Sequence, residues 1–177
     1  MTEFDEMTQD QYAAAAGYWK KKDAQGAAMP EDELREFILK FIQGHNTLAL
    51  ACASDEGIRV TPLEYSWKED SLIVISEGGE KFRHLAKNHT VSACIYEPYT
   101  GFGKLNSLQV QGHVQVAELN ALTAGKYDAL LSYPADVFER LDHPMYLIRI
   151  VPERFDLLSS GLKEKGYAVR QHLYVAG

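Results

Sequence analysis

The sequence lacks any apolar run close to the roughly 18 residues that a membrane-spanning helix needs, so we expect no membrane partner. Residues 1–10, MTEFDEMTQD, are acidic and contain no apolar core, which predicts no secretory signal and a cytoplasmic location. Cysteine is also scarce. Cys52 and Cys94 each lie within an apolar run, and this pattern predicts buried thiols rather than a disulfide framework.

Positive charge is in short supply as well. Lys and Arg number 18 against 25 Asp and Glu, which gives a formal net charge of −7, and the pI is about 5.4. Such a chain has no electrostatic footprint for nucleic acid or for an anionic membrane. An anionic ligand would therefore need a local cluster of cations to overcome the overall field.

The motifs of several common kinds of site are absent. The sequence contains no GxGxxG, GxxxxGK[ST], HExxH, CxxC or GxSxG. No motif therefore indicates a dinucleotide-binding site, a P-loop, a zinc protease or a serine hydrolase. The six histidines show no metal-ligand spacing, and we therefore expect no metal site.

What is present is typical of an ordinary globular chain, with 46% hydrophobic and 24% charged residues. Thr8 and Gln11 predict a capping box before an alanine-rich helix, and the stretch AQGAAMP ends that helix. We therefore divide the chain into an N-terminal helical extension, residues 1–30, and one main domain, residues 31–177.

The spacing of apolar residues changes within the main domain. Apolar positions at helical spacing between Glu31 and Gly44 predict a helix. From Thr47 the pattern becomes strand-like, in the runs TLALACAS, IRVTPLEYSW, SLIVIS and TVSACIY. Pro62 inside the second run predicts an edge strand or a bulge, because proline cannot donate to a neighbouring strand.

The second half of the domain continues the strand pattern. Between residues 108 and 116 apolar and polar residues alternate, with Leu108, Val110, Val114 and Val116 on the buried face. We expect a helical segment over residues 120–131, resumed up to residue 140, and then a strand at MYLIRIV. Short connections leave no room for the crossovers of a parallel sheet. The predicted fold class is α+β, mainly antiparallel β, in a small barrel with helices at its margins.

The segment SEGGEKF offers the clearest indication of a ligand site. Gly78 and Gly79 let backbone N–H groups face outward, and a following helix would add partial positive charge. If the second strand pairs with the third, Arg59 and Ser76 lie near one end of the hairpin, and with Lys81 they would form a phosphate clamp. Solvated surface charges around an ordinary turn explain the same residues, and spacing alone favours that simpler interpretation.

Six stretches, taken in order, resemble one family: TLALACAS, RVTPLEYSW, ISEGGEKFRHLAKN, VSACIYEPYTGFGKL, LQVQGHVQVAE and HPMYLIRIVPERFDLL. They resemble the FMN-binding split-barrel proteins related to pyridoxamine 5'-phosphate oxidase, over roughly residues 31 to 172. The likeness is greatest to a poorly characterised branch from anaerobic bacteria. It implies a split β-barrel of Greek-key type with flanking helices, FMN as the cofactor of the domain at 31–177, and a homodimer with flavin at its interface.

The resemblance also implies roles for individual residues. The cofactor-binding residues that it implies are Arg59, Val60, Thr61, Ser76, Lys81 and Gln109. The two cations would hold the FMN phosphate beside the serine hydroxyl, and the backbone of Val60 and Thr61 would lie along the isoalloxazine ring. Gln109, or its neighbour Ser107, would touch the flavin from a later strand.

Two departures from the family pattern argue against pyridoxamine 5'-phosphate as the substrate. The lysine that closes the second-strand motif in true pyridoxamine phosphate oxidases corresponds here to Glu64, whose carboxylate would repel a phosphate dianion. The family's downstream Tyr/Arg/Ser group is not recognisable in LTAGKYDALLSYPADVF, and Arg170 with His172 matches its Arg-x-His pair only faintly. We therefore expect an FMN-dependent oxidoreductase that acts on another small molecule, with NAD(P)H as a candidate reductant.

The sequence leaves two alternatives open. One is a flavin carrier or sensor without turnover, because no residue identifies a proton donor and the catalytic residues stay unassigned. The other is a barrel that binds haem or another planar ligand in place of FMN, with His113 or His172 as candidate ligands.

Overall fold

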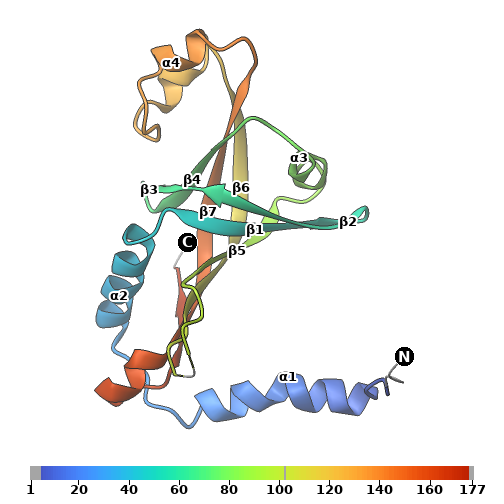
Figure 1. The fold of residues 1–177 in the computed structure, drawn as a ribbon, viewed down its shortest axis with the longest axis vertical. Helices are drawn as coiled ribbons and strands as arrows, with labels where there is room; N and C mark the ends of the chain where they lie inside the picture. Colours follow the sequence, from blue (N-terminus) through green and yellow to red (C-terminus); the bar gives the residue numbers. More distant parts are fainter. Residues whose placement is uncertain (1–4, 102, 176–177) are drawn as a thin grey trace.

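The fold is an antiparallel sheet of eight strands with helices at its margins (Figure 1). The computed structural model describes residues 5–101 and 103–175. The strands are β1 (Thr47–Ser54), β2 (Gly57–Glu64), β3 (Ser66–Lys68), β4 (Ser71–Ser76), β5 (Thr90–Tyr96), β6 (Asn106–Leu119), β7 (Met145–Ser159) and β8 (Arg170–Tyr174). The α-helices are α1 (Gln9–Asp23), α2 (Glu31–Gln43), α3 (Lys81–Leu85) and α4 (Asp136–Glu139), and the 3-10 helices are η1 (Ala124–Tyr127) and η2 (Ser160–Lys165).

The long strands β6 and β7 form a ribbon to which the other strands attach. The strand order is β2-β1-β5-β6-β7-β4-β3, and β8 also pairs with β7. A bulge interrupts the ribbon next to Gly112, where a Cβ atom would lie 2.0 Å from the carbonyl oxygen of Val151, so the close approach requires glycine. The first half of β7 pairs with β4 and the second half with β8. The bulge therefore separates two halves of the ribbon that hold different strands.

The main core lies between α2 and the sheet. Leu34, Ile38 and Ile42 are the buried residues of α2, and they pack with buried apolar residues of the strands. A second, smaller apolar cluster forms where the β6–β7 ribbon ends beneath η1 and α4, and it includes Leu119 and Phe138. The sheet is thus covered at two separate places, which leaves other parts of it exposed.

Helix α1 begins with the predicted capping box, which the structure confirms. The backbone N–H of Thr8 donates to Gln11 Oε1 at 2.8 Å, and the backbone N–H of Gln11 donates to Thr8 Oγ1 at 3.3 Å. None of the residues of α1 is buried, and the helix extends away from the sheet (Figure 1). The loop after α1 is fastened near β8, where the backbone N–H of Met29 donates to Gln171 Oε1 at 3.0 Å.

The predicted fold class is confirmed, although the sheet does not close into a barrel and has β2 and β3 at its two ends. Pro62 lies in β2, which confirms the predicted edge strand. The prediction of one strand over IRVTPLEYSW was wrong, because Tyr65 separates β2 from β3: its hydroxyl donates to Ile42 O at 2.7 Å and its ring is buried. The pairing of the second strand with the third, considered as the way to bring Arg59 to Ser76, holds only for the end of that run: β3 pairs with β4, whereas β2, which carries Arg59, pairs with β1.

Two predictions for the second half of the domain need correction. The segment 120–140 holds only the short helices η1 and α4, in part because Asn120 Oδ1 accepts from the backbone N–H of Leu122 and so competes with a helix. Val116 is 41% exposed rather than buried, because Ala117 and Leu119, on the opposite face of β6, are the residues that pack into the second cluster. Within the described residues, no helix is both long and apolar enough to cross a membrane.

Candidate functional site

A tight hairpin places Arg59 beside Cys52. The strands β1 and β2 are joined by the two-residue turn at 55–56, and this register pairs Arg59 directly with Cys52. Directly paired residues of antiparallel strands share one face of the sheet. Cys52 is 1% exposed on the inner face, whereas Arg59, on the edge strand, is exposed. The guanidinium therefore lies where the core face of the sheet meets solvent.

The end of β4 leads into a turn built from two glycines. Gly78 and Gly79 have φ angles of 124° and 104°, which residues other than glycine rarely adopt. The Ser76 hydroxyl accepts a hydrogen bond from the backbone N–H of Gly78 and donates to its carbonyl oxygen, both at 3.2 Å. The N–H group of Gly78 is therefore already hydrogen-bonded within the turn. The sequence had suggested that it would face outward and be free to bind a ligand.

Lys81 opens α3 and is only 5% exposed. Its ammonium donates to the carbonyl oxygen of Gly78, the same atom that the Ser76 hydroxyl contacts. Helix α3 has five residues and no side-chain cap, so the partial charge of a longer helix, expected from the sequence, contributes little here. The positive charge of this site comes from side chains.

Lys81 and Arg59 lie close enough for their charges to interact. Burial lowers the pKa of the Lys81 ammonium, the nearby Cys52 thiol opposes this effect, and the charge of Arg59 lowers the pKa further. Burial also raises the pKa of the Cys52 thiol. Among the residues that the structure describes, neither Arg59 nor Lys81 forms an ion pair with a carboxylate. Two adjacent cations beside a buried hydroxyl form a site that suits an anion.

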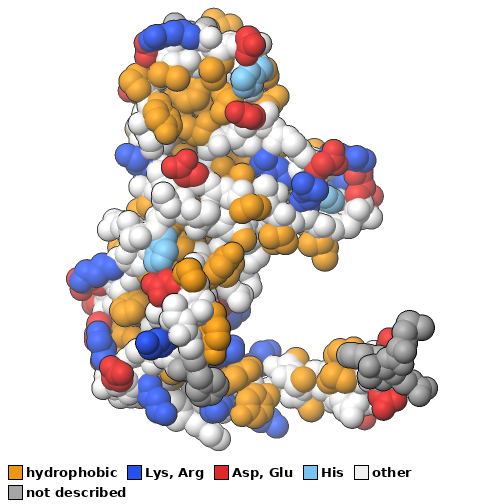
Figure 2. Space-filling view, viewed as in Figure 1, with side chains coloured by type: hydrophobic (Ala, Val, Ile, Leu, Met, Phe, Trp, Pro, Cys, Tyr) orange, Lys and Arg blue, Asp and Glu red, His pale blue; other side chains and the backbone are white. Residues whose placement is uncertain are grey.

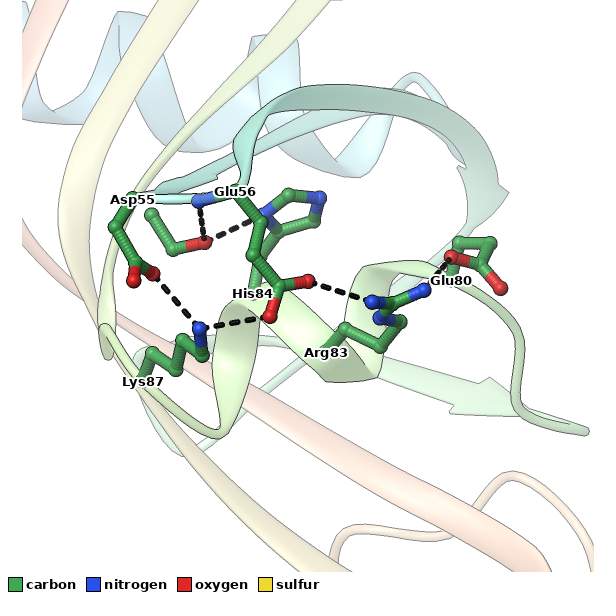
Figure 3. Close-up of polar contacts among 7 residues, drawn as sticks. Asp55, Glu56, Glu80, Arg83, His84 and Lys87 are labelled. Carbon is green, nitrogen blue, oxygen red and sulfur yellow. Dashed lines mark hydrogen bonds and ion pairs between the residues drawn. The ribbon is translucent and has the colours of Figure 1, made fainter.

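A polar network fastens α3 to the β1–β2 turn (Figure 3). Glu56 contacts Arg83 at 3.0 Å and Lys87 at 2.7 Å. Lys87 also contacts the carboxylate of Asp55 at 2.9 Å, and the hydrogen bond from Lys87 is the main reason why the pKa of the Glu56 carboxyl is lowered. The residues of this network, called the turn–α3 network below, are Ser54, Asp55, Glu56, Arg83, His84 and Lys87.

The other residues predicted to bind the cofactor lie on β2 and β6. Thr61 is on the inner face with Arg59, and Val60, which is 59% exposed, is on the opposite, outer face. Gln109 is also on the outer face, in one row with Cys94, Ala49 and Pro62. Three strand spacings separate it from β2, which is about 14 Å. One chain therefore brings Arg59, Ser76 and Lys81 together but does not bring Gln109 to them.

Two residues of the site were missed by the sequence reasoning. Cys52 could have been found, because a two-residue turn fixes the register that pairs it with Arg59. Tyr146 pairs with Ser76 across β4 and β7, and its ring lies 4.9 Å from that of Phe82 in α3. No local signal predicts this contact, because β7 follows β4 only after two further strands.

The residues considered for a substrate or for haem lie apart from Arg59 and Lys81. Glu64 is exposed at the end of β2. Arg170 and His172 are on β8, beside an open groove of about 790 Å³ between β8 and α1. The guanidinium of Arg170 lies 4.1 Å from the centre of the Trp19 ring. His113, on β6, has its Nδ1 atom 2.9 Å from a carboxylate oxygen of Glu153 on β7.

Comparison with solved structures gives the same architecture. A FAD-binding protein from Mesorhizobium loti is 25% identical, with a TM-score of 0.52, over 68% of this chain and 89% of that one. A haem-binding protein from Mycobacterium smegmatis is 17% identical, with a TM-score of 0.55, over 76% of this chain and 56% of that one. A candidate pyridoxamine 5'-phosphate oxidase from Listeria innocua is 20% identical, with a TM-score of 0.53, over 71% of this chain and 98% of that one.

The sequence itself also matches a known family. Residues 31–158 match the family profile named pyridoxamine 5'-phosphate oxidase, and this range contains Arg59, Ser76 and Lys81. A separate comparison with individual proteins that have a curated description found no match. The chain therefore belongs to the pyridoxamine 5'-phosphate oxidase family, whose split-barrel fold it shares with flavin-binding and haem-binding proteins.

Proposed function

We propose that this protein binds FMN and uses it as an oxidoreductase on a substrate other than pyridoxamine 5'-phosphate. One observation carries the proposal: Arg59 and the buried Lys81 lie close enough for their charges to interact, and neither has a carboxylate partner among the described residues. Burial desolvates the Lys81 ammonium and the charge of Arg59 repels it, at a cost in stability. An anion that binds between them would remove that cost.

The chemistry of the donors fits a phosphate group. Arg59 offers a planar fork of N–H donors, and Lys81 offers a compact charge that is held by the single carbonyl oxygen of Gly78. Ser76 adds a hydroxyl donor that now contacts the same carbonyl oxygen. All three donors could turn from Gly78, or from solvent, to phosphate oxygens without any change in the backbone. The proposed role of these residues is to hold the cofactor by its phosphate.

The edge strand β2 would run along the ring of the cofactor. Its only strand partner among the described residues is β1, so the backbone groups of its other edge are available to a ligand. Val60 and Thr61 lie one and two residues beyond Arg59, within reach of a ring whose phosphate is held at Arg59. We assign these two residues to the flavin ring on this basis.

Bound FMN would supply the electron-transfer chemistry, and the protein would fix the position of the ring and its exposure to substrate. No residue of the chain is assigned as a proton donor. The substrate proposal rests on Glu64, because an exposed carboxylate at the end of β2 disfavours a phosphorylated substrate there. NAD(P)H is the proposed source of electrons.

We further propose that the protein acts as a homodimer. Ile58 and Val60 of β2 and Tyr96 of β5 are apolar side chains that are 80%, 59% and 61% exposed. Figure 2 shows a hollow between α1 and the arm formed by β2 and α3, with exposed hydrophobic side chains on both. A second copy seated on the outer face would cover such residues. It could also bring its own Gln109 to the flavin, which Gln109 of the same chain does not reach.

Haem binding is the second candidate function, and one arrangement favours it. The imidazoles of His113 and His172 each contact a carboxylate, Glu153 and Asp156 respectively, through Nδ1. A carboxylate on one ring nitrogen is the usual support of a histidine that binds a metal through the other nitrogen; His113 fits this arrangement, whereas Nε2 of His172 lies 3.7 Å from the carboxylate of Asp23. The two histidines lie on the exposed side of β6 and on β8, away from Arg59 and Lys81.

The absorbance spectrum of the purified protein, and of protein incubated with FMN or haemin, distinguishes these functions. Flavin bands that remain after gel filtration support the flavin proposal, and a Soret band with no retained flavin would contradict it. Anaerobic addition of NADH or NADPH then separates an enzyme from a carrier. Bleaching of the flavin bands is the expected result, and a flavin that stays oxidised with both reductants would contradict the oxidoreductase assignment.

A further inference from the structure

We propose that Glu56 is a positioning residue for the anion site, where it holds Lys81 next to Arg59. The inference rests on the proposed function, because the anion in question is the phosphate of FMN. Within the described residues, Glu56 forms ion pairs with Arg83 and Lys87 and with neither of the two cations of the site. Its proposed effect on the ligand is therefore indirect and passes through α3.

Helix α3 cannot hold its own position. It contains five residues, and a helix of this length has no stability apart from the contacts that it makes with the rest of the protein. Most of those contacts are with β1 and β2, and the Phe82 ring also packs against Tyr146 of β7. Among the described residues, the Lys81 ammonium makes one hydrogen bond, to the carbonyl oxygen of Gly78. The distance between the two cations thus depends on how firmly α3 is attached to the hairpin that carries Arg59.

Glu56 attaches α3 to that hairpin at two points (Figure 3). One carboxylate oxygen contacts Arg83 at 3.0 Å and the other contacts Lys87 at 2.7 Å. Arg83 lies in α3 and Lys87 lies in the turn two residues beyond its end, so the two contacts hold both the helix and the turn that follows it to the hairpin. Glu56 belongs to the turn that leads into β2, only three residues before Arg59. A single carboxylate thereby connects the strand that carries one cation to the helix that carries the other.

Other members of the turn–α3 network support the same attachment. The Ser54 hydroxyl is 2.9 Å from Nδ1 of the buried His84, and it also accepts a hydrogen bond from the backbone N–H of Glu56 at 3.1 Å. Glu80 provides the contrast, because its contact with Arg83, at 3.4 Å, stays within the α3 segment. Glu56 and Glu80 thus share Arg83 as a partner, and only Glu56 joins α3 to the hairpin.

Glu56 and Glu80 allow a test in which the direction of the change in FMN affinity distinguishes positioning from a simple change in charge. Replacing either one by glutamine removes a negative charge near the site, and the change in charge alone would tighten the binding of an anion. Loss of positioning would have the opposite effect. We expect Glu56→Gln to weaken FMN binding about fivefold, which is the upper range for a partly exposed ion-pair network. We expect Glu80→Gln to leave FMN binding unchanged or slightly tighter.

The experiment is a fluorescence titration of cofactor-free protein with FMN and, separately, with riboflavin. A general loss of folding would lower the affinity for both ligands. Loss of Lys81 positioning would lower the affinity for FMN and leave the affinity for riboflavin unchanged. The same substitution is then made together with Lys81→Met. We expect Glu56→Gln to have no further effect on FMN binding in that background, because the residue that it positions is gone.

The possible results separate this inference from the proposed function. If the wild-type protein binds FMN and riboflavin equally, there is no phosphate site to position and both proposals are overturned. If the wild-type protein prefers FMN but Glu56→Gln behaves like Glu80→Gln, only the role of Glu56 is overturned. If Glu56→Gln lowers the affinity for FMN equally in the wild-type protein and in Lys81→Met, the role of Glu56 is overturned too, because its effect would then not pass through Lys81.

Discussion

Replacing Lys81 by methionine should separate ligand binding from stability. Methionine has nearly the length of lysine and no charge, so Lys81→Met removes the ammonium and keeps most of the packing. A charge-assisted contact contributes about 1.5–3 kcal/mol, which corresponds to a loss of FMN affinity of about 10- to 150-fold. The affinity for riboflavin, which carries no phosphate, should stay the same. Fluorescence titration of the cofactor-free protein measures both constants.

Although Lys81→Met lowers the affinity for FMN, it should not lower the stability of the cofactor-free protein. Lys81 is 5% exposed, its pKa is lowered by burial and by Arg59, and the carbonyl oxygen of Gly78 keeps its hydrogen bond from Ser76 when the ammonium is gone. We expect the free energy of unfolding to be unchanged or higher by about 1 kcal/mol at neutral pH. Urea denaturation of the two proteins measures the difference, and Lys163→Met, in an exposed position of η2, is the matched control.

The difference in stability should also depend on pH. A lysine whose pKa is lowered in the folded protein destabilises it fully below that lowered pKa, and the penalty disappears as the pH rises to the ordinary value of 10.5. The advantage of Lys81→Met over the wild type should therefore shrink over this interval. A variant that is clearly less stable than the wild type at neutral pH, yet binds FMN normally, would refute the reasoning.

Three further predictions follow from the fold and the substrate assignment. The wild-type protein should sediment as a dimer at micromolar concentration and Ile58→Glu as a monomer, because a charge would face the partner; a wild-type monomer would contradict the proposed assembly. FMN-loaded protein should form only trace pyridoxal phosphate from pyridoxamine 5'-phosphate, with or without Glu64→Lys. A kcat/KM of about 10⁴ M⁻¹s⁻¹ or more would show that the substrate assignment is wrong. Gly112→Ala should lower the free energy of unfolding by at least about 1–3 kcal/mol in urea denaturation, because its Cβ would lie 2.0 Å from Val151 O; a variant as stable as the wild type would contradict the structure at the bulge.

The fold class and most strands were predictable because their signals are local. Alternating apolar residues identify β6 up to Gln115, and Pro62 correctly indicated an edge strand, because a proline can be placed in a sheet where no N–H is needed. The helices expected over residues 120–140 are reduced to the short η1 and α4. There, side chains such as that of Asn120 bond the local backbone, and the apolar residues pack as a cluster around short turns.

The candidate site was predictable only in part, because its residues meet through long-range pairing. The residue types around the two glycines suggested an anion site, but the hairpin considered between the second and third strands forms only through β3, and Arg59 lies in β2, which pairs with β1. Arg59 meets Lys81 because α3 packs back onto the β1–β2 hairpin. The turn–α3 network that fixes this arrangement joins residues about 30 positions apart, such as Ser54 and His84. Nothing in the local sequence gives such a pairing.

The most direct test of the account is the ratio of the affinities of the wild-type protein for FMN and for riboflavin. The two ligands share the ring and differ in the phosphate, so the ratio isolates what Arg59, Ser76 and Lys81 contribute. We predict that FMN binds at least about tenfold more tightly and that Arg59→Ala removes most of this preference. Equal affinities of the wild-type protein for the two ligands would contradict the central claim that these residues form the phosphate site of a flavin cofactor.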